Sequence, residues 1–231
     1  MNRSRSAIPS QEEKRAVVRS MFDTIAPNYD LLNRLLCLRM DVGWRRKTIR
    51  LLRLRPHSTV FDMACGTGDF CRELEKADHR PVGIDFSRGM LSNARCLSPL
   101  IQGDLLSMPA ADSSFDGAVC GFALRNLTEI PPFLDELFRT VKPGGRVGLL
   151  EVSEPDNRFL RWGHSIYFNR VVPFLGGLIS DRQAYSYLPQ SVEYLPEPVR
   201  LKAMMTDAGF VEVRRNQLFG GVAQVYTATR P

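Results

Sequence analysis

Paired cysteines, long apolar runs and a secretion signal are all missing from this 231-residue sequence. The five cysteines are odd in number and form no Cys-x-x-Cys pair, which excludes a disulfide framework and the usual spacing of a zinc site. No apolar run reaches the ~20 residues that a membrane-spanning helix needs, and the polar N-terminus has no apolar signal core. We therefore expect reduced thiols, no metal site and a cytoplasmic location.

Positive charge is in modest excess, with 31 lysines and arginines against 25 aspartates and glutamates. The formal net charge is +6, and the basic residues are scattered through the chain instead of forming one block. Nucleic acid or an anionic membrane can attract such a protein, but a mildly basic domain more commonly binds neither. With 44% hydrophobic and 24% charged residues, the composition is that of an ordinary globular domain.

Short apolar segments alternate with amphipathic ones through most of the chain, which predicts a parallel sheet covered by helices on both faces. The expected strands are 58–64, 81–85, 100–102, 115–120 and 146–151, and the expected helices between them are 70–77, 89–95 and 130–140. A helix over 199–208 and two strands over 211–217 and 222–229, joined around Gly220 and Gly221, add an antiparallel hairpin. The fold class is therefore α/β, with a doubly wound sheet.

The N-terminal region has helical periodicity instead. One helix is expected from Gln11 until Pro27 interrupts it, and a second over 31–54. We expect one domain over 1–231, in which residues 1–55 form a helical cap and residues 56–231 the sheet-containing core.

A glycine-containing turn follows the first expected strand. Residues 62–68 read Asp-Met-Ala-Cys-Gly-Thr-Gly, and ligands of open α/β sheets bind at the carboxyl ends of the strands. Gly66 and Gly68 permit backbone conformations that side chains block, and they allow close approach by a ligand. A tight turn without a ligand would use the same glycines, so the turn alone does not identify a site.

Acidic residues at the next strand ends strengthen the case. Asp85 ends the second expected strand, where a carboxylate can accept hydrogen bonds from both ribose hydroxyls. Asp104 follows the third, where it can accept from an adenine amino group. Each acid alone also suits a helix cap or a solvated loop, but together they indicate a bound nucleoside.

The turn does not have the sequence of a phosphate site. Asp69 follows Gly68 where a pyrophosphate would lie, and the lysine of a P-loop is missing. A carboxylate there repels phosphate but can help to hold an ammonium group. S-adenosylmethionine has an adenosine end and an amino-acid end, and it fits this pattern best.

At this point the residues match a known family. The chain resembles the UbiE/COQ5 methyltransferases, which methylate a ring carbon of the prenylated quinol precursors of menaquinone and ubiquinone. The resemblance runs from about Val17 to Tyr226, and its diagnostic segments are 29–30 (Tyr-Asp) and 124–126 (Leu-Arg-Asn). It implies a class I S-adenosylmethionine-dependent fold with an antiparallel C-terminal strand, an acceptor-covering insertion at about 155–197, and a homodimer.

The resemblance also implies site residues. Arg125 and Asn126 would lie on the rim that faces the methyl acceptor, and Tyr29 would close the pocket. The residues expected at the cofactor are Asp62, Ala64, Gly66, Thr67, Gly68, Asp85, Asp104, Leu105 and Gly121.

The expected reaction is an SN2 transfer to an electron-rich ring carbon, so the enzyme must align the partners, exclude water and help a phenolic proton to leave. Arg125 is expected to stabilise the phenolate or to relay its proton through a water, because a guanidine with a pKa above about 12 is a poor base. A structural salt bridge is the alternative for Arg125, and helix packing is the alternative for Tyr29. His164 is a weaker candidate for a base.

Departures from the family pattern bear mainly on the acceptor. The family usually has histidine where this chain has Asp41. The other departures are Leu32 for methionine, Cys37 for serine, Gly121 for serine and Thr140 for valine.

Residues 159–179 mix aromatic residues with arginines, a composition that suits either a substrate-covering insertion or peripheral contact with the inner face of a membrane. No nucleic acid is expected, because residues 121–126 lack the Asn-Pro-Pro-Tyr type of segment found in base methyltransferases. The alternatives to a quinol methyltransferase are an enzyme with another aromatic acceptor and a non-catalytic scaffold that binds S-adenosylmethionine. The sequence leaves the choice of ring and the length of its tail open.

Overall fold

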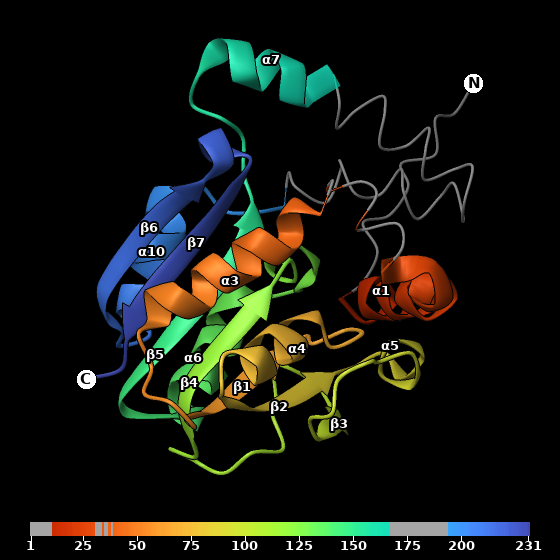
Figure 1. Ribbon diagram of the computed structural model, residues 1–231, viewed down its shortest axis with the longest axis vertical. Coiled ribbons are helices and arrows are strands. Elements are labelled where there is room, and N and C mark those ends of the chain that lie inside the picture. The colour runs from red at the N-terminus through yellow and green to blue at the C-terminus, as the bar shows by residue number, and fades with distance from the viewer. Residues whose placement is uncertain (1–10, 31–33, 35–36, 38, 167–193) are drawn as a thin grey trace.

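The computed structural model describes residues 11–30, 34, 37, 39–166 and 194–231. Its centre is a seven-stranded sheet of order β3-β2-β1-β4-β5-β7-β6 (Figure 1). The strands β1 to β5 are parallel, β7 runs antiparallel to β5, and β6 antiparallel to β7. The doubly wound α/β sheet with an antiparallel C-terminal hairpin is thereby confirmed. The strands are β1 (Thr59–Met63), β2 (Arg80–Asp85), β3 (Leu100–Gln102), β4 (Phe115–Gly121), β5 (Val141–Val152), β6 (Val211–Leu218) and β7 (Ala223–Thr229).

Helices cover both faces of this sheet. The α-helices are α1 (Gln11–Ile25), α3 (Met40–Leu52), α4 (Asp69–Lys76), α5 (Arg88–Ser92), α6 (Ile130–Thr140), α7 (Arg158–Ile166) and α10 (Pro198–Asp207), and short 3₁₀ turns are η1 (Ala26–Asn28), η2 (Leu124–Asn126) and η4 (Phe219–Gly221). The helices α3 and α4 lie on one face, and α6 and α10 lie on the other (Figure 1).

The alternation of side chains along the strands explains the two layers. Val119 faces the cluster that includes Trp44 and Leu52 of α3, while its neighbour Cys120 faces the cluster that includes Phe133 of α6. Because both faces are covered, the central strands bury apolar residues toward both layers, as expected for a parallel sheet.

Two boundaries differ most from the sequence prediction. The strand β5 begins at Val141, which pairs with Phe115, and the register then shifts so that Gly117 pairs with Arg146. Gly144 takes a φ of +77° within the extra residues, a turn that apolar patterning does not reveal. In the predicted helix over 31–54, α3 begins only at Met40, and residues 31–33, 35–36 and 38 lie outside the described part.

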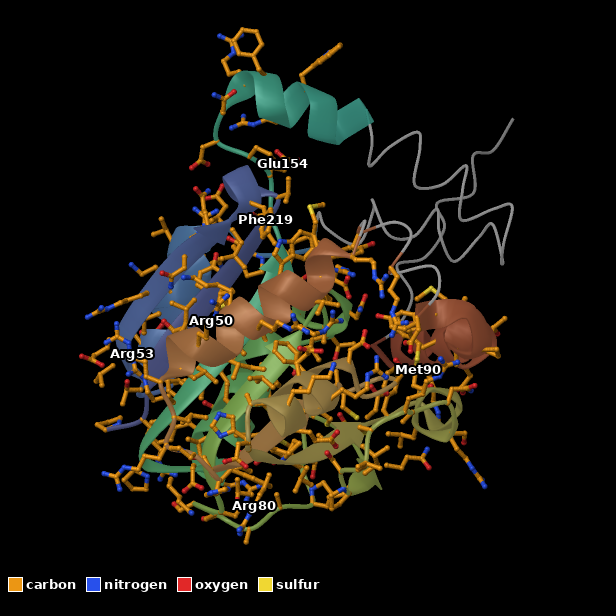
Figure 2. The ribbon with its side chains drawn as sticks, viewed as in Figure 1. Arg50, Arg53, Arg80, Met90, Glu154 and Phe219 are labelled. Atoms are coloured by element: carbon orange, nitrogen blue, oxygen red, sulfur yellow. The ribbon has the colours of Figure 1, made fainter. Side chains whose placement is uncertain are left out.

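The N-terminal helix α1 is fastened at the carboxyl end of β2. The carboxylate of Asp23 accepts hydrogen bonds from the Ser87 hydroxyl at 2.5 Å and the Gly89 N–H at 2.9 Å. This places α1 beside α5 (Figure 1). The helix α7 stands apart from the sheet (Figure 2). Most of the expected insertion, 167–193, lies outside the described residues, and no helix in the described ranges is long and apolar enough to cross a membrane.

Candidate active site

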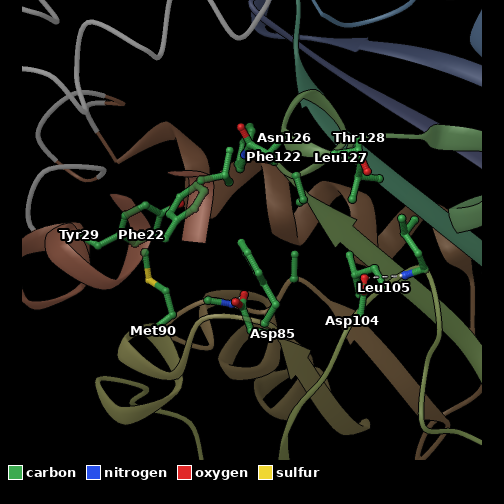
Figure 3. Close-up of a pocket in the computed structure, with 17 residues that line it drawn as sticks. Phe22, Tyr29, Asp85, Met90, Asp104, Leu105, Phe122, Asn126, Leu127 and Thr128 are labelled. Carbon is green, nitrogen blue, oxygen red and sulfur yellow. Dashed lines mark hydrogen bonds between the residues drawn. The ribbon is translucent and has the colours of Figure 1, made fainter. Parts of the chain in front are cut away.

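A cavity lies at the carboxyl ends of β1, β2 and β4 and is bounded by α1 and Tyr29 (Figure 3). Eight of the predicted residues line it: Tyr29, Ala64, Gly66, Asp85, Asp104, Leu105, Gly121 and Asn126. The remaining lining residues, which the sequence did not single out, are Val18, Phe22, Phe86, Met90, Leu106, Phe122, Ala123, Leu127 and Thr128. Val18 and Phe22 are four residues apart in α1, a spacing that also fits ordinary core packing.

The two glycines of the turn have different functions. Gly66 has a φ of +56°, and a Cβ added there would have nothing within 4 Å. Because Gly66 also lines the cavity, a ligand can approach its backbone closely. Gly68 has a φ of +82° at the start of α4, and an added Cβ would lie 2.6 Å from the Cys96 sulfur. Gly66 thus leaves space for a ligand, whereas Gly68 is required by packing and by the turn itself.

The carboxylate of Asp85 is held at the cavity in a fixed orientation. Its Oδ2 accepts the Gly66 N–H at 2.8 Å, and its Oδ1 accepts the Ser87 N–H at 2.9 Å. Burial raises the pKa of Asp85, although these backbone donors act in the opposite direction. Asp104 lines the cavity farther along, and its Oδ1 accepts the Leu106 N–H at 3.0 Å.

Asp62 and Thr67 do not line the cavity but support the turn. The Oδ2 of the fully buried Asp62 accepts hydrogen bonds from the Cys71 N–H at 3.1 Å and from its thiol at 3.2 Å. Burial raises the pKa of Asp62 to about 7. The hydroxyl of Thr67 donates to Asp30, which ties the turn to the segment after Tyr29.

A chain of ion pairs connects α3 to the same turn. Arg45 of α3, which is buried, lies 2.6 Å from Asp41 and 3.3 Å from Asp69. Asp69 also pairs with Arg72, which lies 3.7 Å from Asp30. Asp41, where the family resemblance implies histidine, is therefore the anion at one end of this series of ion pairs.

Arg125 lies behind the cavity wall instead of lining it. Its guanidinium pairs with the fully buried carboxylate of Glu151, and its Cζ lies 5.9 Å from the centre of the Phe122 ring. Phe122 has a φ of +60°, a left-handed conformation uncommon for a large side chain. Asn126, the next residue after Arg125, does line the cavity. The structure thus contains the salt bridge considered as the alternative for Arg125, and Glu151 is a partner that sequence reasoning did not assign.

The residues of the cavity fit S-adenosylmethionine. Two carboxylates at successive strand ends suit the ribose and the adenine amino group, and Phe86, Met90 and Leu105 offer apolar contacts to a base. Neither lysine nor arginine is among the described lining residues, so nothing there neutralises a pyrophosphate. A cofactor without phosphate is the better match.

Comparison with known proteins agrees with this geometry. The model of the ubiE/COQ5 methyltransferase family matches residues 9–230. A demethylmenaquinone methyltransferase of Thermus thermophilus is 41% identical over 221 residues, covering 91% of this chain and 100% of the relative. A ubiquinone/menaquinone biosynthesis C-methyltransferase UbiE of Syntrophotalea carbinolica is also 41% identical over 221 residues, covering 92% and 93%.

Solved structures share the fold at low identity. A SAM-dependent methyltransferase of Thermotoga maritima has a TM-score of 0.66 at 17% identity, covering 92% of this chain and 99% of its own. A phosphoethanolamine N-methyltransferase 2 of Haemonchus contortus, in complex with S-adenosyl-L-methionine, has a TM-score of 0.60 at 12% identity, covering 82% and 52%.

Proposed function

Because this chain belongs to the ubiE/COQ5 methyltransferase family, we infer that it transfers a methyl group from S-adenosylmethionine to a ring carbon of a quinone precursor. The observation that carries this inference is the family match over 9–230, which includes the cavity and the N-terminal residues that bound it. The bound cofactor supplies an electrophilic methyl group on a sulfonium. The protein's own residues bind, orient and shield the reactants.

We propose that the methyl acceptor is demethylmenaquinol. The names of the Thermus and Syntrophotalea relatives have menaquinone in common, whereas only the second also covers ubiquinone. A quinol ring is already electron-rich, and loss of a phenolic proton raises the electron density at the ortho carbon further. The protein therefore needs to supply orientation and charge stabilisation instead of a nucleophile of its own.

Four residues that line the cavity, and Arg125 behind its wall, can serve this reaction. Asp85 would accept from the ribose hydroxyls and Asp104 from the adenine amino group, so that the cofactor is fixed at the strand ends. Phe22 and Tyr29, whose ring centres are 6.3 Å apart, would cover the site from the N-terminal side and exclude water. Arg125 would stabilise the phenolate through the N–H donors of its guanidinium.

The test is methyl transfer from labelled S-adenosylmethionine under reducing conditions, with a short-tailed demethylnaphthoquinol and the matching benzoquinol offered separately. Transfer to the naphthoquinol is expected, and Arg125→Ala should reduce kcat by about 100-fold. Arg50→Ala, an exposed change on the outer side of α3 (Figure 2), is the matched control and should leave the rate unchanged. No transfer to either quinol with cofactor binding intact would point to another aromatic acceptor or to a non-catalytic scaffold that binds S-adenosylmethionine, and absence of cofactor binding would refute the proposed function.

For delivery of so apolar an acceptor, we propose that α7 contacts the membrane surface. Phe159 and Trp162 are 88% and 71% exposed and three residues apart, so they share one side of the helix. Arg158 and Arg161 are exposed beside them, and such a surface suits anionic headgroups above an apolar layer.

Co-sedimentation with anionic vesicles at low salt tests the contact. Phe159→Ser combined with Trp162→Ser should abolish binding, while Leu97→Ser, an equally exposed apolar residue elsewhere, should not. Failure of the wild-type protein to bind vesicles would refute this part of the proposal.

A further inference from the structure

Three polar atoms behind the cavity wall have no hydrogen-bond partner among the described residues. They are Oε2 of Glu151, Nε of Arg125 and Oδ1 of Asn126, and all three are buried. Glu151 lies near the end of β5, and its other oxygen accepts from Arg125 and from the Val152 N–H at 3.0 Å. In this ion pair, one carboxylate oxygen of Glu151 and the Nε of Arg125 therefore lack hydrogen bonds among the described residues.

This pattern is unusual for a purely structural salt bridge. A buried charge pair compensates its loss of water only when the remaining polar atoms are also hydrogen-bonded, and nearly all buried polar groups in folded proteins have partners. Here the unsatisfied atoms gather next to Asn126, which lines the cavity. Such exceptions concentrate where a substrate or an ordered water completes the set.

Charged and neutral groups both lie near the pair. The Cζ of the buried Arg45 is 5.5 Å from the centre of the Phe122 ring that Arg125 also approaches, and Arg45 is paired with Asp41 and Asp69. Cys120 of β4 faces Glu151, and burial, followed by the negative charge of Glu151, raises the pKa of this thiol. Cys37 faces Arg125 from the N-terminal side, and burial raises its pKa to about 11. On β7, Gln224 is the register partner of Glu151. Both thiols remain neutral at physiological pH, so Glu151 is the carboxylate that balances the charge of Arg125.

We propose that Glu151 is a positioning residue for methyl transfer. It fixes the guanidinium of Arg125 behind the cavity wall and cancels its charge, so that Arg125 offers oriented N–H donors to the acceptor oxygen without a net positive charge. This inference rests on the proposed function, because it assigns the acceptor's phenolic oxygen as the group that Arg125 serves.

Removal of the negative charge of Glu151 should have two separate effects, one on the pH profile of kcat and one on its plateau value. In Glu151→Gln the charge of Arg125 is no longer cancelled, which favours the ionised phenol, so the rising limb of the kcat–pH profile should move to lower pH by about one unit. The guanidinium also loses its fixed orientation, so the plateau value of kcat should fall about 10- to 100-fold. The KM for S-adenosylmethionine should stay within about threefold.

The experiment compares Glu151→Gln, Glu151→Asp, Arg125→Ala and the double variant Arg125→Ala/Glu151→Gln in the quinol methylation assay. Glu151→Asp keeps the charge and should restore the wild-type pH profile. The double variant should be no slower than Arg125→Ala, because the two residues act as one unit. Glu154→Gln, which changes an exposed carboxylate three residues away (Figure 2), is the control.

Melting temperature and cofactor binding are measured in parallel to separate folding from catalysis. An unshifted pH profile, or a loss in the double variant equal to the product of the single losses, would overturn the positioning role. Failure of the wild-type protein to methylate any quinol would overturn the proposed function and this inference with it. If the wild-type protein methylates a quinol and Glu151→Gln does so at the same rate and with the same pH profile, the positioning role of Glu151 is overturned while the proposed function stands.

Discussion

Gly121 lines the cavity, and its surroundings restrict which residues can replace it. An added Cβ would lie 2.8 Å and 3.0 Å from two ring atoms of Phe70, a buried residue of α4. The serine that the family resemblance implies here would add the same atom. Substitution of Gly121 therefore requires the Phe70 ring to move by about 0.6 Å to reach an ordinary contact of 3.4 Å.

The expected cost follows from two opposing contributions. Overpacking of a dense core costs about 1–3 kcal/mol, and replacing a strand glycine with alanine recovers about 0.5–1 kcal/mol. Taking the middle of each range, we expect Gly121→Ala to lower the free energy of unfolding by about 1 kcal/mol. For a chain of this length, that corresponds to a decrease in Tm of about 2–4 °C.

Urea denaturation of Gly121→Ala, Phe70→Leu and the double variant measures this contribution. The double variant should be more stable than the sum of the single effects predicts by about 1 kcal/mol, because the smaller side chain removes the clash. Gly163→Ala, where an added Cβ meets nothing within 4 Å in α7, is the control and should not destabilise. Strict additivity, or a Gly121→Ala variant as stable as the wild type, would refute the reasoning.

Three further changes test the turn and its supports. Burial raises the folded-state pKa of Asp62 from 3.8 to about 7, so this group makes the wild-type free energy of unfolding fall as pH rises from about 4 to 7. In urea titrations at several pH values, Asp62→Asn should therefore show a weaker dependence of stability on pH. An unchanged pH dependence would contradict the raised pKa. Gly68→Ala should lower the free energy of unfolding by about 2–4 kcal/mol, because it combines a left-handed φ with a Cβ 2.6 Å from the Cys96 sulfur. In thermal unfolding, the double variant Gly68→Ala/Cys96→Ala should recover part of the lost stability. Asp85→Asn should weaken S-adenosylmethionine binding about 10- to 100-fold by calorimetry; wild-type affinity would exclude the ribose role.

The order of helices and strands was predictable because each element has a clear period or composition. Apolar segments such as 115–120 read directly as buried strands, and Pro27 marks the end of α1. The start of β5 was not predictable, because the extra residues between Val141 and Arg146 read as a turn in the sequence, and only the pairing of Val141 with Phe115 adds them to the strand. Local pattern determines the elements, whereas pairing determines their boundaries.

The site was predictable where a residue's function follows from its place on a strand end. Asp85 and Asp104 line the cavity as such a position implies. Asp62 also belongs to a strand, but its carboxylate is directed at the Cys71 N–H and lies away from the cavity. Glu151 was missed because it ends an apolar strand, and only the tertiary contact with Arg125 distinguishes it from a core residue.

The ion-pair chain from α3 to the glycine turn has a consequence for how this sequence can evolve. Arg45 is shared between Asp41 and Asp69, so loss of one acid leaves a buried cation half neutralised. A histidine at position 41, the residue that the family resemblance implies there, would remove that anion and leave Asp69 as the remaining acid beside Arg45. Substitutions at 41, 45 and 69 should therefore be inherited together, and descendants of this chain should replace them as a set.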